Sequence, residues 1–270
     1  MSECTHDCSS CGENCSSREI QKLKPNEHSS IKKIYAVVSG KGGVGKSMVT
    51  SMLSVLTNRK GYKVGVMDAD ITGPSMCNEF GLTGKTSGCD FGIMPMTTPT
   101  GIEVISMNMF LNNPSDPVVW RGSMLNGVIN QFFQDVFWGD LDYLYIDMPP
   151  GTGDIPLTVF QSLPIDGIIV VTSPQDLVSM IVEKAVKMAK LMNVPIVGLV
   201  QNLSYFECPN CKNKHFIFGE GKIEEVARNY EIDSISYLPI DPKLAESSDN
   251  GMMEWFQGDY LDSLIEKITK

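Results

Sequence analysis

The sequence contains no apolar run that approaches the ~18 residues needed to cross a bilayer. Its first twenty residues are polar and contain no apolar stretch of the kind that directs secretion. Positive charge is also scarce, because 22 lysines and arginines stand against 32 acidic residues, for a formal charge of −10 and a pI of about 4.8. A chain this acidic is poorly suited to bind nucleic acid or an anionic membrane. We therefore expect a cytoplasmic protein with neither of these as a partner.

The chain has eight cysteines, which in a reducing cytoplasm are rarely joined as structural disulfides. Metal binding or redox chemistry is then the leading use for some of them. Four lie within residues 1–30, a segment with too few apolar residues to build a core, so we expect it to be a flexible metal-binding or cluster-binding region. Residues 31–270 are long enough for one domain, without internal repeats.

Predicted strands and helices alternate along this domain. Apolar, β-branched runs predict strands at 34–39, 63–68, 103–107, 143–147, 167–172, 196–202 and 234–237. Helical spacing predicts helices at 46–60, 123–135, 177–192, 222–230 and 260–268. The alternation predicts an α/β fold, a mostly parallel sheet with helices on both faces. Functional loops of such folds lie at the carboxyl ends of the strands.

Residues 40–47, GKGGVGKS, match the phosphate-loop pattern G-x-x-x-x-G-K-[ST]. They follow a predicted strand and open a predicted helix, which is the context that the motif requires. The glycines let backbone N–H groups surround phosphate oxygens, and the helix N-terminus adds its dipole. Lys46 would reach the β- and γ-phosphates, and the Ser47 hydroxyl would bind Mg²⁺.

Lys41 is a second lysine in the same loop. It has two interpretations. Its side chain is either solvated, or it reaches across a dimer interface to the phosphates of the neighbouring subunit, as an arginine finger does in trans.

Carboxylates follow two predicted strands. Asp68 and Asp70 end one strand, and Asp147 ends another. Phosphate-loop enzymes hold Mg²⁺ with carboxylates at such positions, usually through water. Asp147 also opens the loop at 147–154, DMPPGTGD, whose glycines allow close approach to a γ-phosphate, so the loop can respond to that phosphate.

Cys208 and Cys211 form a C-x-x-C pair after the predicted strand at 196–202. Two thiolates cannot complete the four-ligand shell of a cluster or of tetrahedral zinc. A homodimer supplies the missing two by symmetry if the loop lies near the two-fold axis. The alternatives are a redox-active pair and half of a zinc ribbon, although no second C-x-x-C follows.

The N-terminal cysteines have the spacing C-x₃-C-x₂-C-x₃-C, which lets one segment wrap a cubane cluster or a zinc ion. They are Cys4, Cys8, Cys11 and Cys15. A [4Fe–4S] cluster, zinc and no metal are the three alternatives. The first three also have radical-SAM spacing, which does not suit a phosphate-loop domain. Cys77 is expected in a short helix, as a small core residue.

The loop at 41–47 resembles the deviant Walker A motif of the SIMIBI-class ATPases. Four further strings resemble the Mrp/ApbC-type iron–sulfur cluster carriers within that class, and the resemblance covers residues 31–270. They are DADITGPS at 68–75, WRG at 120–122, DMPPGTGD at 147–154 and LPIDP at 238–242.

The resemblance implies an ATP-dependent homodimer that binds a [4Fe–4S] cluster at its interface, delivers it to apoproteins and hydrolyses ATP slowly. It makes Lys41 the signature lysine, lets Asp70 position the attacking water and gives Asp68 and Asp147 a role in supporting Mg²⁺. Cys208 and Cys211 become the shared cluster site, and Asn202 contacts the base. The implied catalytic residues are Lys41, Lys46 and Asp70. The implied nucleotide site comprises Gly40, Lys41, Gly42, Gly43, Val44, Gly45, Lys46, Ser47, Met48, Asn202, Pro239 and Asp241.

Two other functions are compatible with a phosphate-loop fold. A spatial-positioning ATPase cycles on a membrane or on DNA, but the apolar residues at helical spacing within 260–270 lie in a net acidic segment, so we expect them to dock on the protein's own core. An ATP-gated electron donor such as the nitrogenase iron protein has cluster cysteines flanking its switch regions, whereas the loop at 147–154 contains none.

Overall fold

The computed structural model describes residues 22–113, 116, 118, 122–151, 153–175 and 177–270. Within them, eight strands form one sheet in the order β12-β9-β8-β1-β7-β2-β6-β5. All neighbours are parallel except β5 and β6, which run antiparallel. These strands are β1 (Ser30–Ser39), β2 (Val64–Asp68), β5 (Met96–Thr97), β6 (Glu103–Ile105), β7 (Asp140–Asp147), β8 (Gly167–Thr172), β9 (Ile196–Gln201) and β12 (Ile235–Tyr237).

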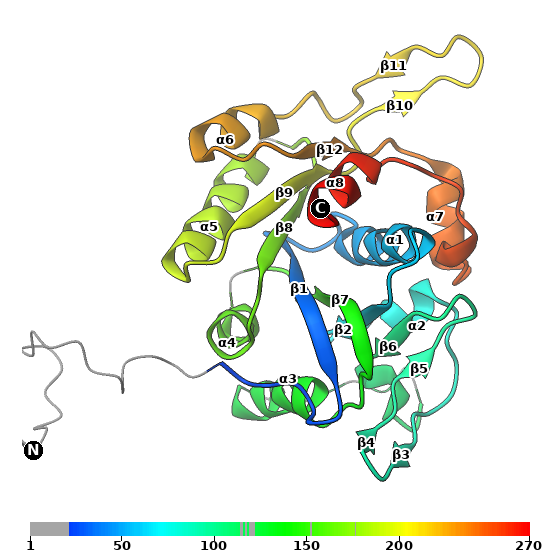
Figure 1. The fold of residues 1–270 in the computed structure, drawn as a ribbon. Coiled ribbons are helices and arrows are strands. Elements are labelled where there is room, and N and C mark those ends of the chain that lie inside the picture. Colours follow the sequence, from blue (N-terminus) through cyan, green and yellow to red (C-terminus); the bar gives the residue numbers. More distant parts are fainter. Residues whose placement is uncertain (1–21, 114–115, 117, 119–121, 152, 176) are drawn as a thin grey trace, which may run out of the picture.

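Helices cover both faces of this sheet, with α1 and α8 on one side and α3, α4 and α5 on the other (Figure 1). The helices are α1 (Lys46–Arg59), α2 (Met76–Glu79), α3 (Ser123–Gln134), α4 (Asp154–Ser162), α5 (Leu177–Leu191), α6 (Ile223–Tyr230), α7 (Pro242–Asp249) and α8 (Asp262–Ile268). Two 3₁₀ turns are η2 (Met107–Met109) and η3 (Met253–Trp255). The predicted α/β architecture is therefore confirmed.

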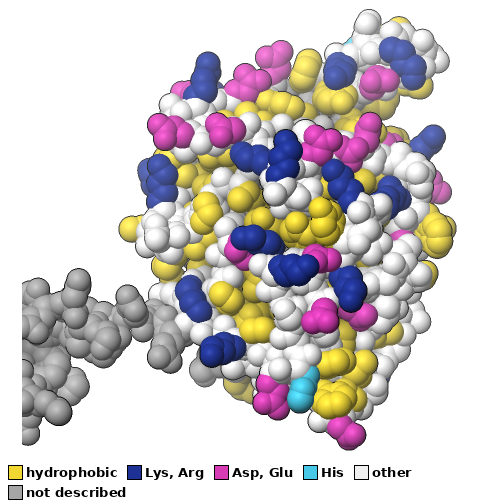
Figure 2. Space-filling model, viewed as in Figure 1, with side chains coloured by type: hydrophobic (Ala, Val, Ile, Leu, Met, Phe, Trp, Pro, Cys, Tyr) yellow, Lys and Arg dark blue, Asp and Glu magenta, His cyan; other side chains and the backbone are white. Residues whose placement is uncertain are grey.

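Two small hairpins lie outside the main sheet. One pairs β3 (Gly88–Cys89) with β4 (Gly92–Ile93), and the other pairs β10 (Phe206–Glu207) with β11 (Lys214–His215). The β10–β11 hairpin projects from the body of the molecule (Figures 1 and 2). Its C-x-x-C turn is thus held away from the sheet.

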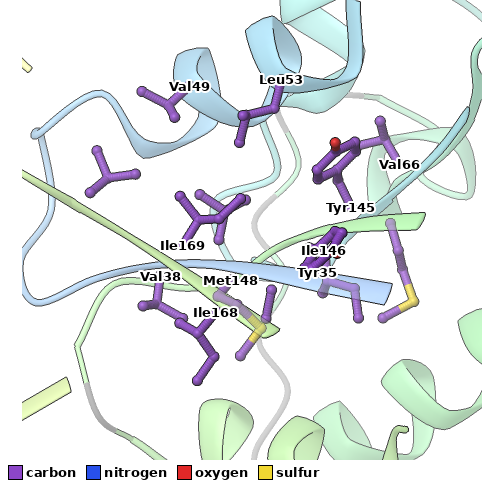
Figure 3. Packing of buried hydrophobic residues seen from close by; sticks show 14 of the residues in the cluster. Tyr35, Val38, Val49, Leu53, Val66, Tyr145, Ile146, Met148, Ile168 and Ile169 are labelled. Atoms are coloured by element: carbon purple, nitrogen blue, oxygen red, sulfur yellow. The ribbon is translucent and has the colours of Figure 1, made fainter. Parts of the chain in front are cut away.

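The core lies on both faces of the sheet, and on one face strand residues meet the apolar face of α1 (Figure 3). Val49 and Leu53 of α1 are fully buried, as is Tyr145 of β7. The Tyr145 hydroxyl lies 2.7 Å from Thr57 Oγ1, so its one polar atom has a partner inside the core. This packing fixes α1, and with it the loop that precedes α1, against the central strands.

Most observed boundaries lie within one residue of the predicted ones, but β1 begins at Ser30 and β7 at Asp140, where the predicted strands begin at 34 and 143. The strand predicted at 103–107 ends at Ile105, because Ser106 turns its hydroxyl to Asp68 Oδ2 at 2.9 Å and η2 follows. The helix predicted at 260–268 begins at Asp262. Helices α4 and α7 and both hairpins were not predicted.

The apolar residues of the C-terminal segment are buried, as expected. Leu261, Leu264, Ile265 and Ile268 all pack into the core. The apolar face of α8 is therefore occupied by the protein itself. Among the described residues, no helix has the length and apolar character to span a bilayer.

Residues 22–29 contact the domain that follows them. Lys22 Nζ donates to the carbonyl of Phe160 at 2.5 Å, and the Leu23 N–H donates to the Ser162 carbonyl at 2.7 Å. The expected boundary after residue 30 falls inside β1. The four cysteines of the N-terminal segment lie outside the described residues, as do Trp120 and Arg121.

Candidate functional site

The predicted phosphate loop and two of the predicted acidic residues meet at the carboxyl edge of the sheet. Strand β1 leads into the loop, β2 ends at Asp68 and β7 ends at Asp147. Val37 and Asp68 are both register partners of Asp147, so the three strand ends are adjacent. The sheet order thus brings together residues that are about 100 positions apart in the chain.

The phosphate loop has the backbone that close approach requires. Gly43 and Gly45 have φ of +77° and +81°, which favours glycine. A methyl group placed on Gly45 would lie 2.3 Å from Asn202 Nδ2, so this position also has no room for a side chain. Gly45 precedes α1 without a side-chain cap from a described residue, and the first turn of α1 contains no acidic residue. The backbone N–H groups of the loop and of the first turn of α1 are therefore available to bind an anion.

Lys46 forms a buried ion pair with Asp147. Lys46 Nζ lies 2.6 Å from Asp147 Oδ2, and the two side chains are 7% and 0% exposed. Ser47 Oγ donates to the same oxygen at 2.7 Å, and Thr50 Oγ1 donates to Oδ1 at 2.7 Å. Both oxygens of Asp147 are thus satisfied within the chain, Oδ2 by the lysine and the serine that the motif assigns to phosphate and magnesium, and Oδ1 by Thr50.

Asp68 is fully buried and holds the segment that follows β2. Its Oδ2 accepts hydrogen bonds from the N–H groups of Ser75 and Met76 at 3.0 and 3.1 Å, besides the Ser106 hydroxyl. Burial, and then the nearby charge of Asp147, raise the pKa of Asp68 to about 7. In this arrangement the carboxylate anchors a loop, and its predicted part in supporting magnesium stays a prediction.

Asp70 lines a cleft of about 360 Å³ over the phosphate loop. It accepts from the Gly73 N–H at 3.2 Å and the Thr72 hydroxyl at 3.3 Å, and burial raises its pKa. Residues of the phosphate loop and of α2 and α7 form the rest of the lining. The cleft is lined by Ser39, Gly42, Gly43, Gly45, Lys46, Ser47, Met48, Asp70, Glu79, Pro150, Ala245, Ser248 and Asp249. Loop and acid therefore face one space, as predicted for a nucleotide site.

Glu79 is an acidic residue of the cleft that the sequence analysis missed. Its carboxylate accepts from Ser51 Oγ at 3.2 Å and from Ser248 Oγ at 2.8 Å, so it joins α1, α2 and α7. Burial raises the pKa of Glu79 to about 7. The sequence has no motif around Glu79 that would reveal this.

The cleft and the residues beneath it offer oxygen donors to a divalent cation, although no group of three or more carboxylates among the described residues could hold the ion by itself. Asp147, Asp68 and Asp70 lie near one another with a single lysine, Lys46, among them, so the negative charge exceeds the positive. Carboxylate and hydroxyl oxygens are the ligands that Mg²⁺ prefers. Ser47 and Asp147 are the residues here that suit it best, since their oxygens are already 2.7 Å apart.

Asn202 directly follows β9 and touches the phosphate loop. Its Nδ2 donates to the Val44 carbonyl at 2.9 Å. Pro239 and Asp241 do not appear among the described residues that line the cleft. Asp241 instead caps α7 by accepting from the Lys243 N–H at 2.9 Å. Direct contacts of these three residues with a nucleotide stay predictions.

Lys41 points to another loop of its own chain. Its Nζ donates to Gln175 Oε1 at 2.6 Å. Gln175 lies three residues beyond the end of β8, which neighbours β1 in the sheet. The sequence analysis did not single out Gln175.

Cys208 and Cys211 lie in the turn of the projecting β10–β11 hairpin, Cys208 partly buried and Cys211 exposed. The Cys208 N–H donates to the Asn213 carbonyl at 3.0 Å, and the Lys212 N–H donates to the Cys208 carbonyl at 2.9 Å. Hydrogen bonds from the backbone N–H groups of Cys211 and Asn210 lower the pKa of the Cys208 thiol. A lowered pKa favours the thiolate, which is the form that binds metals.

No third ligand joins these two thiols within the described part of one chain. No group of three or more His, Cys, Asp or Glu side chains there could hold a metal ion. Cys77 is buried in α2, as predicted, and burial raises the pKa of its thiol to about 11. Cys89 is exposed in the β3–β4 hairpin. The pair in the β10–β11 hairpin therefore depends on ligands from elsewhere for a complete shell.

A family model for ParA-group proteins, described as NUBPL iron-transfer P-loop NTPase, matches residues 30–269. An iron–sulfur cluster carrier protein of Clostridium perfringens is 48% identical over 248 residues, which cover 89% of this chain and 87% of the relative. A protein of the same description from Methanocaldococcus jannaschii is 42% identical over 262 residues, covering 93% and 90% of the two chains.

Solved structures of similar proteins share the fold. A nucleotide-binding protein from Archaeoglobus fulgidus, solved in complex with ADP, superposes with a TM-score of 0.78 at 44% identity, covering 86% of this chain and 91% of the other. The cell division ATPase MinD of Pyrococcus furiosus gives a TM-score of 0.62 at 20% identity, covering 88% and 98% of the two chains. At that identity the likeness concerns the fold alone.

Proposed function

The chain belongs to the NUBPL-type iron-transfer P-loop NTPases of the ParA group, and we propose that it is an ATP-dependent carrier of an iron–sulfur cluster. In this proposal a homodimer binds one [4Fe–4S] cluster between two β10–β11 hairpins and delivers it to apoproteins. The observation behind it is a pair of thiols on a projecting hairpin, in a chain that also has a cleft over its phosphate loop.

Nucleotide binding replaces contacts that the chain makes with itself. The triphosphate lies against the N–H groups of the phosphate loop, and Lys46 exchanges Asp147 for phosphate oxygens. Ser47 and Asp147 are the residues that would hold Mg²⁺, which neutralises charge on the phosphates. The Asp147 carboxylate loses the positive charge of Lys46 in this exchange, and Mg²⁺ would replace it.

Asp70 is the residue that orients the attacking water. It lines the cleft and accepts hydrogen bonds from the Gly73 N–H and the Thr72 hydroxyl, so it is a hydrogen-bond acceptor on the edge of the phosphate space. Lys41 supplies a positive charge to the phosphates of the partner subunit in trans, which makes turnover slow in the monomer. The cleft thus hydrolyses ATP at an appreciable rate only in the dimer.

The cluster is cargo held by Cys208 and Cys211 of both subunits. Two thiolates from each chain complete the four-ligand shell. The lowered pKa of Cys208 favours the thiolate, which is the form that binds the cluster. Cys4, Cys8, Cys11 and Cys15 form a second site, which holds another cluster or zinc.

Anaerobic reconstitution of single-cysteine variants tests this proposal. Cys208→Ser and Cys211→Ser should each lose about one four-iron cluster per dimer, because each change removes two of the four ligands. Both variants should still bind ATP and should fail to activate an apo iron–sulfur protein. Iron, sulfide and zinc are measured per chain, together with the activity recovered by the acceptor.

Cys89→Ser is the matched control, since Cys89 is also a free, exposed cysteine in a hairpin. It should retain the iron content and transfer of the unaltered protein. Full iron content and transfer in either Cys208→Ser or Cys211→Ser would contradict the shared site.

A further inference from the structure

The loop that follows β8 contacts the phosphate loop. Gln175 Oε1 accepts a hydrogen bond of 2.6 Å from Lys41 Nζ. The two loops are neighbours because β8 and β1 are paired up to Val171 and Ser39. Gln175 itself is exposed, whereas Pro174 before it is buried. The loop is therefore fixed at Pro174 and touches Lys41 with its next residue.

The same loop contacts the base of the β10–β11 hairpin. A methyl group placed on Gly221 would lie 3.2 Å from Pro174 Cα and 2.6 Å from Gln201 Oε1, and Gly221 has φ of +77°. Gln201 Nε2 also donates to the Glu220 carbonyl at 3.1 Å. The chain leaving the hairpin thus runs in direct contact with the residue that precedes Gln175.

The chain entering the hairpin is tied to the phosphate loop as well. Asn202 Nδ2 donates to the Val44 carbonyl, and the Asn202 N–H donates to the Thr172 carbonyl, both at 2.9 Å. Residues 202–221 contain the hairpin, with Cys208 and Cys211 near its tip. The segment begins at Asn202, which contacts the phosphate loop, and ends at Gly221, which packs on Pro174 beside Gln175. Only the contact through Gln175 depends on a flexible charged side chain.

We propose that Gln175 is a positioning residue that couples the phosphate loop to the cysteine hairpin through its contact with Lys41. A lysine ammonium bonds more strongly to phosphate oxygens than to a neutral amide, because the attraction between opposite charges adds to the hydrogen bond. In the dimer, nucleotide bound by the partner subunit therefore draws Lys41 away from Gln175. The loop after β8 then loses the hydrogen bond between Lys41 and Gln175. The chain that leaves the β10–β11 hairpin, which packs on Pro174 at Gly221, is then free to move.

This inference rests on the proposed function for the roles of Lys41 and the two cysteines. It gives that function a physical link between ATP turnover and the cluster. Coupling is reciprocal, so the state of the hairpin also alters how firmly the cleft binds nucleotide.

Hydrogen exchange of the cluster-free, full-length chain tests the coupling. The reporters are the Cys208 and Lys212 amides, whose N–H groups are bonded within the turn. Exchange is measured with and without a saturating, non-hydrolysable ATP analogue and Mg²⁺, with saturation established by titration of each variant. In the unaltered chain we expect the analogue to change the exchange rate at least about fivefold, the lower end of usual coupling between sites.

Gln175→Ala should bind the analogue and lose this response. Gln175→Asn should restore it at least in part, because its neutral amide oxygen still accepts from the flexible Lys41 side chain. Gln257→Ala is the matched control, since Gln257 is an exposed glutamine hydrogen-bonded to its own segment at the Trp255 carbonyl, and it should respond as the unaltered chain does. A rescue by Asn but not by Ala distinguishes positioning from a merely structural effect.

The proposal is overturned if the Gln175→Ala chain responds fully, if that variant no longer binds the analogue, or if the unaltered chain shows no response. None of these outcomes depends on cluster binding. Failure of the cluster site is detected separately, as unchanged iron content in Cys208→Ser and Cys211→Ser.

Discussion

Lys41 is a charged residue of the phosphate loop, and its ammonium group contacts another loop at Gln175. Lys41 is not among the described residues that line the cleft of its own chain. We predict that Lys41→Ala lowers the rate of ATP hydrolysis by ~10³–10⁵, the usual range for a cation supplied in trans, while the chain still binds nucleotide. Phosphate release and equilibrium binding of ATP are the two measurements.

Lys184→Ala serves as the control for this change, because Lys184 is an exposed lysine on α5. It should hydrolyse ATP like the unaltered chain. A Lys41→Ala protein that is monomeric and fully active would rule out the role in trans.

Glu79 makes stability depend on pH. Burial raises its pKa from 4.5 to about 7, so between these values the folded chain keeps a proton that the unfolded chain has lost. The favourable contribution of the protonated Glu79 carboxyl to the free energy of unfolding is therefore full below pH 4.5, and it is lost as the pH rises through about 7. We predict that Glu79→Gln stabilises the protein at about pH 8 relative to about pH 5, by up to about 3 kcal/mol at ~1.4 kcal/mol per pKa unit.

Urea unfolding of both chains at the two pH values measures this difference. Glu246→Gln, a change at an exposed residue of α7, is the matched control and should leave the pH dependence as it is. An equal effect of Glu79→Gln at both pH values would show that the carboxyl does not titrate in this window.

Sequence reasoning located the residues of the cleft that belong to a motif, and missed those that only a fold brings near. Lys46, Ser47 and Asp147 were predicted, and they meet at 2.6–2.7 Å. Thr50 lies one helical turn after Lys46, so the spacing could have revealed it. Gln175 is 134 residues from Lys41 and has no pattern of its own, so its contact follows only from the pairing of β8 with β1.

Helix α8 is an element whose apolar face is buried by the chain itself. Leu264 is fully buried, and its Cδ1 lies so close to β9 that a methyl group on Gly198 would be 2.6 Å away. We predict that Leu264→Ala lowers the free energy of unfolding by about 2–5 kcal/mol, since it removes buried methyl groups and leaves a cavity.

Chemical denaturation measures this loss. Glu266→Ala changes an exposed residue of the same helix and should have an effect within about 0.5 kcal/mol. If Leu264→Ala had no larger effect than Glu266→Ala, the docking of α8 would not contribute to stability.

The long elements of the sheet could be predicted from the sequence, because each has an apolar run or a helical period. The strand at 167–172 was predicted with the bounds that β8 has. The hairpins were not, since strands of two residues are too short to show a period. Helix α7 could have been found, because Asp241 and Pro242 are a typical N-cap and first residue.

On the scale of the whole molecule, the domain is expected to fold without its N-terminal cysteines. The first described residues, Lys22 and Leu23, already contact α4. We predict that deletion of residues 1–21 leaves a folded dimer that binds ATP and keeps the cluster at Cys208 and Cys211, because those ligands lie on the far hairpin. Iron beyond one four-iron cluster per dimer should disappear with the segment.

Iron and zinc analysis of the anaerobically reconstituted full chain and the deletion measure this. The thermal transition of the deleted protein is the control for folding. Iron content that does not change on deletion would mean that the four thiols hold zinc or nothing, and zinc analysis distinguishes those two cases.

The ion pair between Lys46 and Asp147 has a consequence for the order in which the chain folds and binds nucleotide. Each charge is buried with its opposite, and the hydroxyls of Ser47 and Thr50 fill the remaining acceptor positions. A newly synthesised molecule can therefore reach its mature shape before it meets any nucleotide. Nucleotide is then bound by a protein that is already folded, and a cell can hold a pool of the folded, nucleotide-free protein.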